Sequence, residues 1–385
     1  MGEKSLKILF LSSYPPRKCG IATFTQDLVT SLRQLPLVTI GIVALGDGSY
    51  GYGDEVLFSI ERHEEKDYQE AAKRINESGY DLLIIEHEYG LFGKEDGKEV
   101  LTLAKEIHLP IVTTFHTILS HPNERQKDIL SSLCNLSDAV VTMAGNSRDM
   151  LVSTYDADVT KIHVIPHGVP SFEGYQNRDA LKAEADLEGR IIISTFGLLS
   201  SGKGLEYGIE ALENVVKTHP KVIYLIAGQT HPVVREREGE LYRHKLQYLV
   251  SSHGLENHVR FINHYFSQED IVKLLLMSDI YLTPYLGKEQ AVSGTLAYAA
   301  GCGKAIVSTP YPYAKELLDE GRGCLADFAD VSSLSKQLSF LLDNPDELHR
   351  MERKMKVYGS AMVWSSVACR YAELCKSIVE AGVKA

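Results

Sequence analysis

Short apolar runs alternate with amphipathic stretches along almost the whole chain. An amphipathic stretch repeats its apolar residues every three or four positions, as a helix with one buried face requires. A continuous apolar run suits a strand that is buried on both faces. The alternation therefore predicts a parallel sheet with helices on both sides. In the first half we predict strands at 7–12, 38–43, 82–86, 111–115, 139–142 and 163–166, and helices at 23–35, 68–77 and 97–107.

The same alternation begins again after a polar stretch at 171–189, which we interpret as a linker with a short helix. Strands are expected at 191–196, 222–227, 259–262, 280–284, 305–308 and 323–326, and helices at 204–217, 239–252, 267–277 and 333–343. The predicted fold class is α/β, with two doubly wound, Rossmann-like domains in series. Ligands of such sheets bind beyond the carboxyl ends of the strands, and two such domains facing each other are expected to form a deep cleft.

The composition of the chain limits which binding partners and which cellular compartment we expect. The formal net charge of -11 argues against nucleic acid as the main partner, since phosphate backbones attract clustered Lys and Arg. We find no apolar run long enough to span a bilayer, and the apolar core at 8–11 is too short for a signal peptide. The six scattered cysteines suit reduced thiols. We therefore expect a cytoplasmic protein without stable membrane insertion.

Several polar residues of the first half follow predicted strands. Gly20 lies in the loop SSYPPRKCGIATF, where the next helix would point N–H groups at a phosphate or a sugar hydroxyl; an ordinary strand–helix turn is the alternative. Glu86, His87 and Glu88 follow a later strand, and His116 follows another. Such a histidine is often purely structural. A zinc site made of His87, His116 and Glu88 is a further interpretation, which the absence of an HExxH motif disfavours.

In the second half, the stretch FGLLSSGKGLE at 196–206 follows a predicted strand. Gly197, Gly202 and Gly204 surround Lys203 at a helix start. A lysine there can pair with a nucleotide diphosphate as a point charge, although a solvated lysine in a glycine turn is the ordinary alternative. The stretch is not a Walker A loop, since Lys203 is followed by glycine.

Another strand exit leads to Ser293, Gly294 and Thr295, directly before a helical run at 296–300. The N–H groups at the head of that helix form an anion site, and the glycine leaves room for a ligand to approach. Glu289 lies upstream on the loop, too far along the chain to cap the helix itself. It is therefore available to accept hydrogen bonds from sugar hydroxyls, or is simply an exposed loop glutamate.

Taken in order, these segments resemble the retaining glycosyltransferases of family 4, which have the two-Rossmann GT-B architecture. The resemblance covers nearly the whole chain. It rests on an ordered set of motifs: the glycine loop after the first strand, TFH near 115, SDAVVTMAGN, IPHGV, FGLL…GKG, LIAG at 225–228, MSDIYLTPY at 277–285 and the block from Glu289 through GT and AAGCGKAIVST.

The resemblance implies transfer of a sugar from a nucleotide-diphosphate sugar to an acceptor hydroxyl, above all that of a carbohydrate. Retention at the anomeric carbon is implied, without a metal or other cofactor. The first domain, 1–170, would bind the acceptor, and the second, 171–360, the donor. The segment 361–385, which contains Trp364, looks like the C-terminal helix that crosses back onto the first domain in this fold.

Roles carried over from the resemblance divide between the domains. Lys203 would neutralise the diphosphate and Glu289 would hold the sugar. The donor-side backbone would come from Gly197, Gly202, Ser293, Gly294 and Thr295. His116 would face the sugar, and Gly20, Glu86, His87 and Glu88 would lie on the acceptor side.

Two departures from the family pattern stand out. The arginine usual beside the glycine of FGLL is replaced by Leu198, and a second glutamate is replaced by Ala297 or Tyr298, depending on how it is aligned. Losing one cation weakens diphosphate stabilisation by an amount on the order of a few kcal/mol. Candidate substitutes are Arg17, Lys18 and Lys288. Because of these departures, a phosphorylase-like variant using sugar 1-phosphate or phosphate, and a non-catalytic sugar-nucleotide binding protein, stay open.

Overall fold

The chain divides into two compact units, each with its own parallel sheet. The computed structural model describes residues 5–382. Residues 1–4 and 383–385, which the predicted ranges 1–170 and 361–385 include, lie outside the described residues. Within the described residues, unit 1 comprises residues 5–168 and 364–382, and unit 2 comprises residues 169–363.

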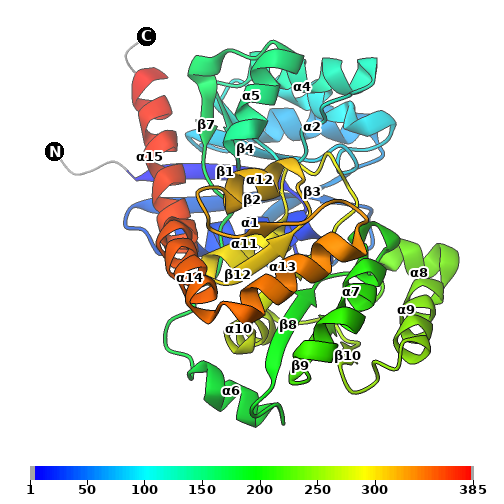
Figure 1. The fold of residues 1–385 in the computed structure, drawn as a ribbon. Helices are drawn as coiled ribbons and strands as arrows, with labels where there is room; N and C mark the ends of the chain where they lie inside the picture. The colour runs from blue at the N-terminus through cyan, green and yellow to red at the C-terminus, as the bar shows by residue number, and fades with distance from the viewer. Residues whose placement is uncertain (1–4, 383–385) are drawn as a thin grey trace. The chain divides into compact units, whose positions relative to one another are not determined.

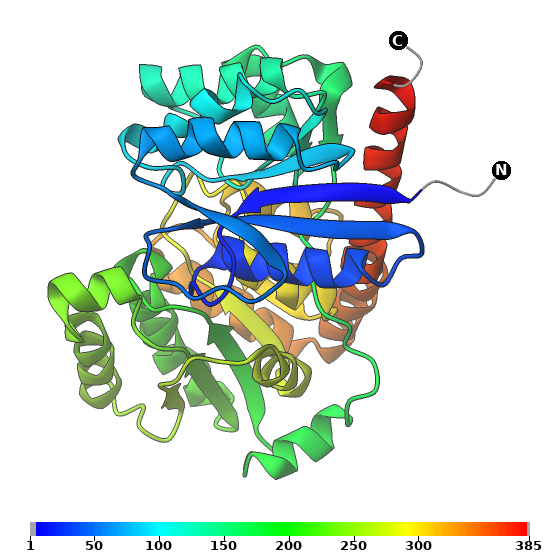
Figure 2. The ribbon, with the colours of Figure 1, turned by 180° about the vertical axis from the view of Figure 1, so that it is seen from behind.

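Unit 1 contains a seven-stranded parallel sheet in the order β3-β2-β1-β4-β5-β6-β7. The strands are β1 (Leu6–Ser12), β2 (Val38–Gly46), β3 (Val56–Glu61), β4 (Leu82–His87), β5 (Ile111–Phe115), β6 (Ala139–Thr142) and β7 (Ile162–Val164). The first two strands run side by side in Figure 2. Since β2 lies on one side of β1 and β4 on the other, the strand order reverses at β1. The loops that leave β1 and β4 therefore flank the point where ligands of doubly wound sheets bind.

The helices of unit 1 cover both faces of this sheet. They are α1 (Gly20–Leu32), α2 (Glu65–Asn76), α3 (Glu99–Ala104), α4 (Glu124–Leu136), α5 (Gly145–Tyr155) and α15 (Trp364–Gly382), with short 3-10 turns at Glu95–Gly97 and Val159–Lys161. The last helix, red in Figure 1, packs against α1. The C-terminal helix is thus part of unit 1 although 195 residues of unit 2 precede it in the chain.

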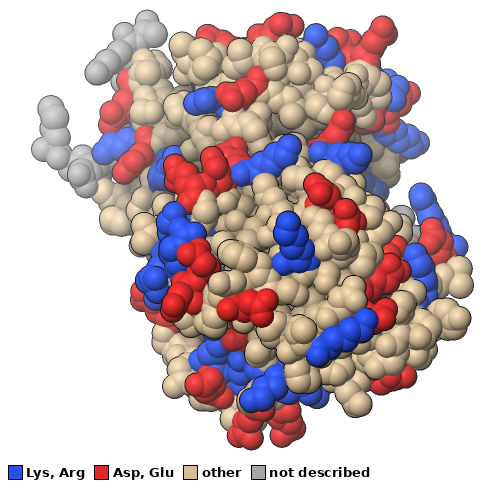
Figure 3. Space-filling model, in the orientation of Figure 1, with Lys and Arg blue, Asp and Glu red and all other residues tan. Residues whose placement is uncertain are grey.

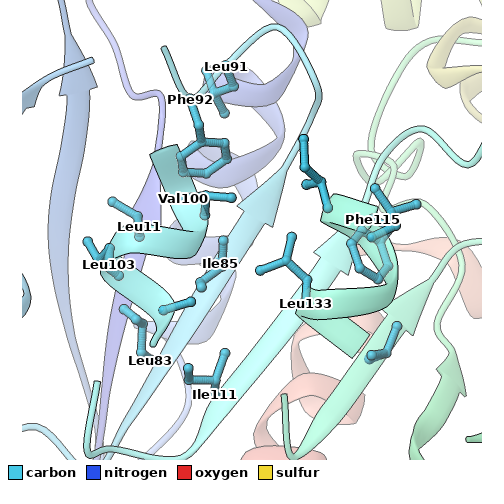
Figure 4. Packing of buried hydrophobic residues seen from close by; sticks show 14 of the residues in the cluster. Leu11, Leu83, Ile85, Leu91, Phe92, Val100, Leu103, Ile111, Phe115 and Leu133 are labelled. Carbon is cyan, nitrogen blue, oxygen red and sulfur yellow. The ribbon is translucent and has the colours of Figure 1, made fainter. Parts of the chain in front are cut away.

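The core of unit 1 is formed where apolar strand residues meet the helices on one sheet face. Figure 4 shows Leu83, Ile85 and Ile111 of the strands beside Val100 and Leu103 of α3. All five side chains are almost fully removed from solvent. Burial of such side chains stabilises a fold by about 1.5–3 kcal/mol each, so the alternation of the sequence accounts for the position of this sheet.

Unit 2 contains a six-stranded parallel sheet in the order β10-β9-β8-β11-β12-β13. The strands are β8 (Ile191–Phe196), β9 (Val222–Ala227), β10 (Val259–Ile262), β11 (Ile280–Thr283), β12 (Ala305–Ser308) and β13 (Cys324–Leu325). Here the order reverses at β8, which pairs with β9 on one side and β11 on the other. The loops after β8 and β11 therefore meet at the switch point of this sheet.

Nine helices of unit 2 lie within the described residues (Figure 1). They are α6 (Arg178–Glu184), α7 (Leu205–Thr218), α8 (Pro232–Glu238), α9 (Leu241–Ser252), α10 (Gln268–Met277), α11 (Gly294–Gly301), α12 (Pro312–Leu318), α13 (Val331–Asp343) and α14 (Pro345–Gly359), with 3-10 turns at Ser201–Lys203 and Ser360–Met362. The predicted linker at 171–189 indeed contains a short helix, α6.

The predicted fold class is confirmed, since both units are parallel, Rossmann-like α/β structures. The predicted strands coincide with observed ones within three residues at each end. One strand, β3, and four helices, α4, α5, α8 and α12, were not predicted. The edge strand β3 alternates exposed and partly buried residues, so it lacks the continuous apolar run that identifies the other strands.

Candidate functional site

In unit 1, the loop after β1 ends at the N-terminus of α1. Cys19 caps this helix, because its Sγ accepts a hydrogen bond from the amide of Ala22 at 3.4 Å and lies 3.1 Å from Oγ of Ser13. A Cβ placed on Gly20 would meet no atom within 4 Å, and its φ is not positive. Neither a tight turn nor close packing calls for this glycine, so the approach of a ligand remains a prediction.

Glu86 and His116 form a pair at the ends of β4 and β5. Nε2 of His116 lies 2.7 Å from a carboxylate oxygen of Glu86, and the Glu86 side chain is completely buried. Beside them, the hydroxyl of Thr117 donates to Glu88 at 2.6 Å. The ring of Phe24 on α1 contacts the His116 ring edge-on, with centroids 4.7 Å apart. The structure therefore brings together predicted residues from two strand exits and anchors the histidine on two sides.

His87 points away from this pair into the core of unit 1. Its ring lies among Tyr89, Phe92 and Phe115, with centroids 5.4 to 5.8 Å apart, and has no exposed surface. Among the described residues, neither ring nitrogen has a hydrogen-bond partner. Burial, with a smaller contribution from nearby His116, lowers the pKa of His87 to about 3. The imidazole is therefore neutral at physiological pH, and its role as an acceptor-side residue stays a prediction.

Another histidine of unit 1, His167, is partly buried. Nδ1 of His167 lies 2.7 Å from the carbonyl oxygen of Gly168. The ring packs near Phe24 and Trp364, at centroid distances of 5.3 and 6.2 Å. Burial lowers the pKa of His167 to about 4. In the sequence, the segment IPHGV contributed only to the family resemblance, because nothing in it shows which rings surround the histidine.

In unit 2, the loop after β8 depends on its glycines for shape. Gly197 has φ 128° and a Cβ there would lie 3.2 Å from Cγ2 of Thr295. Gly204 has φ 58°, and its Cβ would lie 2.2 Å from the carbonyl oxygen of Pro284. The amide of Leu286 donates to the carbonyl of Gly202 at 2.9 Å. The glycines thus let the β8 loop pack directly against the segment that follows β11.

This packing places Lys203 beside the head of α11. Its ammonium nitrogen lies over the ring of Tyr285, 3.9 Å from the centroid. The hydroxyl of Tyr285 lies 2.7 Å from Oγ1 of Thr295, and Oγ of Ser293 lies 3.3 Å from the same atom. A cation and a helix N-terminus therefore share one edge of the sheet. Both attract anions, so this edge is suited to a phosphate group.

The helix α11 begins as predicted from its small residues. Ser293 is the N-cap, and its Oγ accepts a hydrogen bond from the amide of Leu296 at 3.3 Å. Gly294 and Thr295 form the first turn, whose N–H groups have no acceptor within the helix itself. Glu289 lies exposed on the loop between β11 and α11. Four predicted donor-side residues thus occupy one continuous segment.

The positions that depart from the family pattern have ordinary packing. Leu198 is half-buried in the β8 loop. Ala297 is completely buried, and Tyr298 is half-buried with its ring 6.2 Å from that of Phe196. Lys288 lies over the ring of Phe328, with its ammonium 5.6 Å from the centroid. Of the three candidate substitute cations, Lys288 belongs to unit 2, and Arg17 and Lys18 belong to the β1 loop of unit 1.

Sequence reasoning did not identify Tyr285, although its side chain contacts both Lys203 and Thr295 at this edge of the sheet. The only signals in the sequence were its position directly after the predicted strand at 280–284 and its place at the end of the family motif MSDIYLTPY. On the face shown in Figure 3, Lys and Arg side chains are interspersed with Asp and Glu. Within residues 5–382, no group of three or more His, Cys, Asp or Glu side chains is placed to hold a metal ion. No helix in that range combines the length and apolar character needed to cross a membrane.

Comparison with known proteins identifies the class to which this fold belongs. The fold resembles the crystal structure of Anabaena Alr3699/HepE in complex with UDP, with a TM-score of 0.75 and 17% identity over 97% of this chain and 100% of that one. It also resembles sucrose-phosphate synthase from Thermosynechococcus elongatus, with a TM-score of 0.77 and 15% identity over 98% of this chain and 100% of that one. These neighbours are GT-B glycosyltransferases.

Family models assign the chain more closely. Residues 177–357 match the model of Glycosyl transferases group 1, and residues 20–171 match that of Glycosyltransferase Family 4. The chain therefore belongs to the family-4-like glycosyltransferases, as the motifs indicated.

Curated relatives are more distant in sequence. Spore coat protein SA of Bacillus subtilis is 24% identical over 240 residues, 60% of this chain and 62% of that protein. The phosphatidylinositol N-acetylglucosaminyltransferase GPI3 subunit of Saccharomyces cerevisiae is 24% identical over 237 residues, 60% of this chain and 49% of that protein. The matched stretch thus spans about half to three fifths of the length of these relatives.

Proposed function

We propose that this chain is a metal-independent, retaining hexosyltransferase. It would move a sugar from a nucleotide-diphosphate sugar to the hydroxyl of an acceptor, above all a carbohydrate. The observation that carries this proposal is the donor-side edge of unit 2, where Lys203 and the N-terminus of α11 lie on either side of Tyr285. Two sources of positive potential at one strand edge fit a diphosphate, which carries its charge on neighbouring phosphoryl groups.

In this reaction the bond between the anomeric carbon and the diphosphate oxygen breaks, and a bond to the acceptor oxygen forms. The electron pair of the broken bond goes to the diphosphate, and the acceptor proton follows it to a phosphate oxygen. Lys203 and the first N–H groups of α11 would stabilise the charge that develops on the departing group. They would take the place that a divalent cation fills in other phosphate sites. Entry of the acceptor on the face from which the diphosphate leaves would retain the configuration.

His116 would serve the sugar or the acceptor from unit 1. Its Nε2 faces the carboxylate of Glu86 at 2.7 Å, so a neutral ring would carry its proton on that nitrogen. Nδ1 would then be left to accept a hydrogen bond from a hydroxyl. Glu289, exposed before α11, would hold hydroxyls of the donor sugar.

The related structures suggest which donor to test first. Structures of Anabaena Alr3699/HepE contain UDP and UDP-glucose, so UDP-glucose is the first probe. Calorimetry should show binding of UDP-glucose, or of another nucleotide sugar, by the wild-type protein. Release of UDP in a panel of carbohydrate acceptors, with proton NMR of the product's anomeric signal, tests transfer and retention. We expect activity to persist in EDTA.

The substitution Lys203→Ala tests the donor-side edge. Removal of a transition-state cation should lower the transfer rate by about 10²- to 10³-fold. The matched control is Lys217→Ala, an exposed lysine of α7 that pairs with Glu213, which should retain the wild-type rate. Loss of activity in EDTA with recovery on adding a divalent ion would contradict the metal-free mechanism. Formation of sugar 1-phosphate on adding phosphate would assign the chain to phosphorylases instead. Failure of every nucleotide sugar to bind would overturn the proposal.

A further inference from the structure

Tyr285 is held rigidly in the segment after β11. Its side chain and backbone together are only 1% exposed. Its carbonyl oxygen accepts a hydrogen bond from the Thr309 hydroxyl at 2.6 Å. The Tyr285 ring stacks on that of Tyr311, with centroids 5.9 Å apart and planes within 11°. A buried aromatic side chain with a fixed backbone and a stacked neighbour has little freedom to change rotamer.

This one side chain contacts both elements of the donor-side edge. Its ring face lies 3.9 Å from the Lys203 ammonium, and its hydroxyl lies 2.7 Å from Oγ1 of Thr295, the second residue of α11. The residues on either side of Tyr285 in the sequence also contact the loop that carries Lys203. Pro284 lies against Gly204, and the Leu286 amide donates to Gly202. The lysine loop and the helix N-terminus are therefore linked through Tyr285.

The contact with Tyr285 affects how freely the Lys203 side chain can move. A lysine side chain has about 2 kcal/mol of rotamer entropy to lose when it is fixed. Attraction between an ammonium and an aromatic face amounts to about 0.5–1 kcal/mol at exposed sites and about 2 kcal/mol when desolvated. A ring that already holds the ammonium reduces the ordering that ligand binding must impose. The effect would matter most where a neighbouring cation is missing, as at Leu198.

We propose that Tyr285 is a positioning residue for the diphosphate. Its ring holds Lys203 and its hydroxyl holds Thr295, so that the cation and the head of α11 keep a fixed geometry. The inference rests on the proposed function, since it specifies how that same site orders its charge. It adds a residue whose action goes through Lys203 rather than through direct contact with the donor.

The first test compares substitutions by calorimetry with UDP. Tyr285→Leu removes the ring and should weaken UDP binding by between about 2-fold and 30-fold, the range set by a cation–aromatic contact. Tyr285→Phe keeps the ring and should weaken UDP binding less than Tyr285→Leu does, by about 5-fold, the central value for one net hydrogen bond. Both substitutions should weaken UMP binding less than they weaken UDP binding. The control Tyr68→Leu removes another fully buried tyrosine, in α2 of unit 1, and should lower thermal stability without changing UDP affinity.

The second test reads the contact itself, without any ligand. Protons on the Lys203 side chain should show an upfield ring-current shift in a ¹³C–¹H spectrum, with the signal assigned by its loss in Lys203→Met. The shift should persist in Tyr285→Phe and disappear in Tyr285→Leu. In the double variant Lys203→Met with Tyr285→Leu, the loss of UDP affinity should be smaller than the sum of the single losses, because the two residues act as a unit.

The outcomes separate the inference from the proposed function. If the wild type binds none of UDP, GDP and ADP, the proposed function fails, while the ring-current shift still shows whether Tyr285 holds Lys203. If the wild type binds UDP but Tyr285→Leu binds it equally well, the inference is overturned and the function stands. Additive losses in the double variant, or an unshifted Lys203 signal in the wild type, would also overturn it.

Discussion

The buried His87 and the partly buried His167 predict that unit 1 loses stability in mild acid. Burial lowers the pKa of His87 to about 3 and that of His167 to about 4, from an ordinary value of 6.5. Both are bases whose folded pKa is depressed, so the unfolded chain binds more protons below pH 6.5. Stability is therefore complete above pH 6.5 and falls as the pH drops toward 4 and 3.

The magnitude follows from proton linkage. At pH 5 an unfolded histidine is almost fully protonated, whereas His87 in the folded chain is almost fully neutral. The free energy of unfolding should then be lower at pH 5 than at pH 7 by about 2 kcal/mol for His87. His167 should contribute less, because its side chain is partly exposed. Together they are a large fraction of the 5–15 kcal/mol that holds an ordinary domain folded.

The single tryptophan provides the assay. Trp364 lies in unit 1 with its ring 6.2 Å from that of His167, so its fluorescence in urea reports the unfolding of this unit. The variant His87→Phe places a third phenylalanine beside Phe92 and Phe115. Between pH 7 and pH 5 the free energy of unfolding of this variant should fall by about 2 kcal/mol less than that of the wild type. His87→Leu differs in shape but should show the same pH difference.

Parallel pH curves for the wild type and both variants would refute this reasoning. Such a result would mean that His87 is protonated in the folded chain or is reached by solvent. The comparison uses differences between pH values within each variant, so a steric cost of the substitution cancels. It tests burial of the imidazole directly.

Three further predictions concern unit 2. Glu289→Gln should reduce sugar transfer more than UDP binding, by kinetics and calorimetry; equal losses would place the side chain on the nucleotide. Gly204→Ala should lower the free energy of unfolding in urea by about 1–2 kcal/mol or more and weaken UDP binding, because its Cβ would meet Pro284. The control Gly254→Ala also has a positive φ, 63°, but open space around it, and should leave UDP affinity unchanged. Asp279→Asn should lower the free energy of unfolding by about 2 kcal/mol, because its carboxylate accepts from Lys182 at 2.7 Å in a partly buried ion cluster; an unchanged urea midpoint would refute that.

Strand positions could largely be read from the sequence. The runs at 191–196 and 222–227 were predicted with the bounds that β8 and β9 have in the structure. Parallel strands between two helix layers are apolar throughout, and this property is local to the run. The helix α4 could also have been found, since Asn123 and Gln126 form a capping box at its start. The edge strand β3 could not, because two of its six residues are exposed and only one is fully buried.

Some residues of the candidate site could likewise be predicted from the sequence, and others could not. Loops that leave parallel strands carry the ligand contacts in this architecture, so Lys203 and the Ser293 turn could be singled out from strand ends and glycines alone. Tyr285 could not, because its role comes from a ring face and a hydroxyl that reach two other loops. The burial of His87 was equally hidden, since it follows the same kind of strand as its partly exposed neighbour His116.

The sequence by itself determined the alternation of strands and helices, the two-domain α/β class and the loops that carry chemistry. These depend on periodic burial and on turn-forming residues, which act over a few positions of the chain. Only the tertiary structure decided that Glu86 meets His116, thirty residues away, that Lys203 lies on Tyr285, and that His87 turns inward. Such contacts depend on strand order and on how side chains pack across a sheet edge, and no local pattern encodes either.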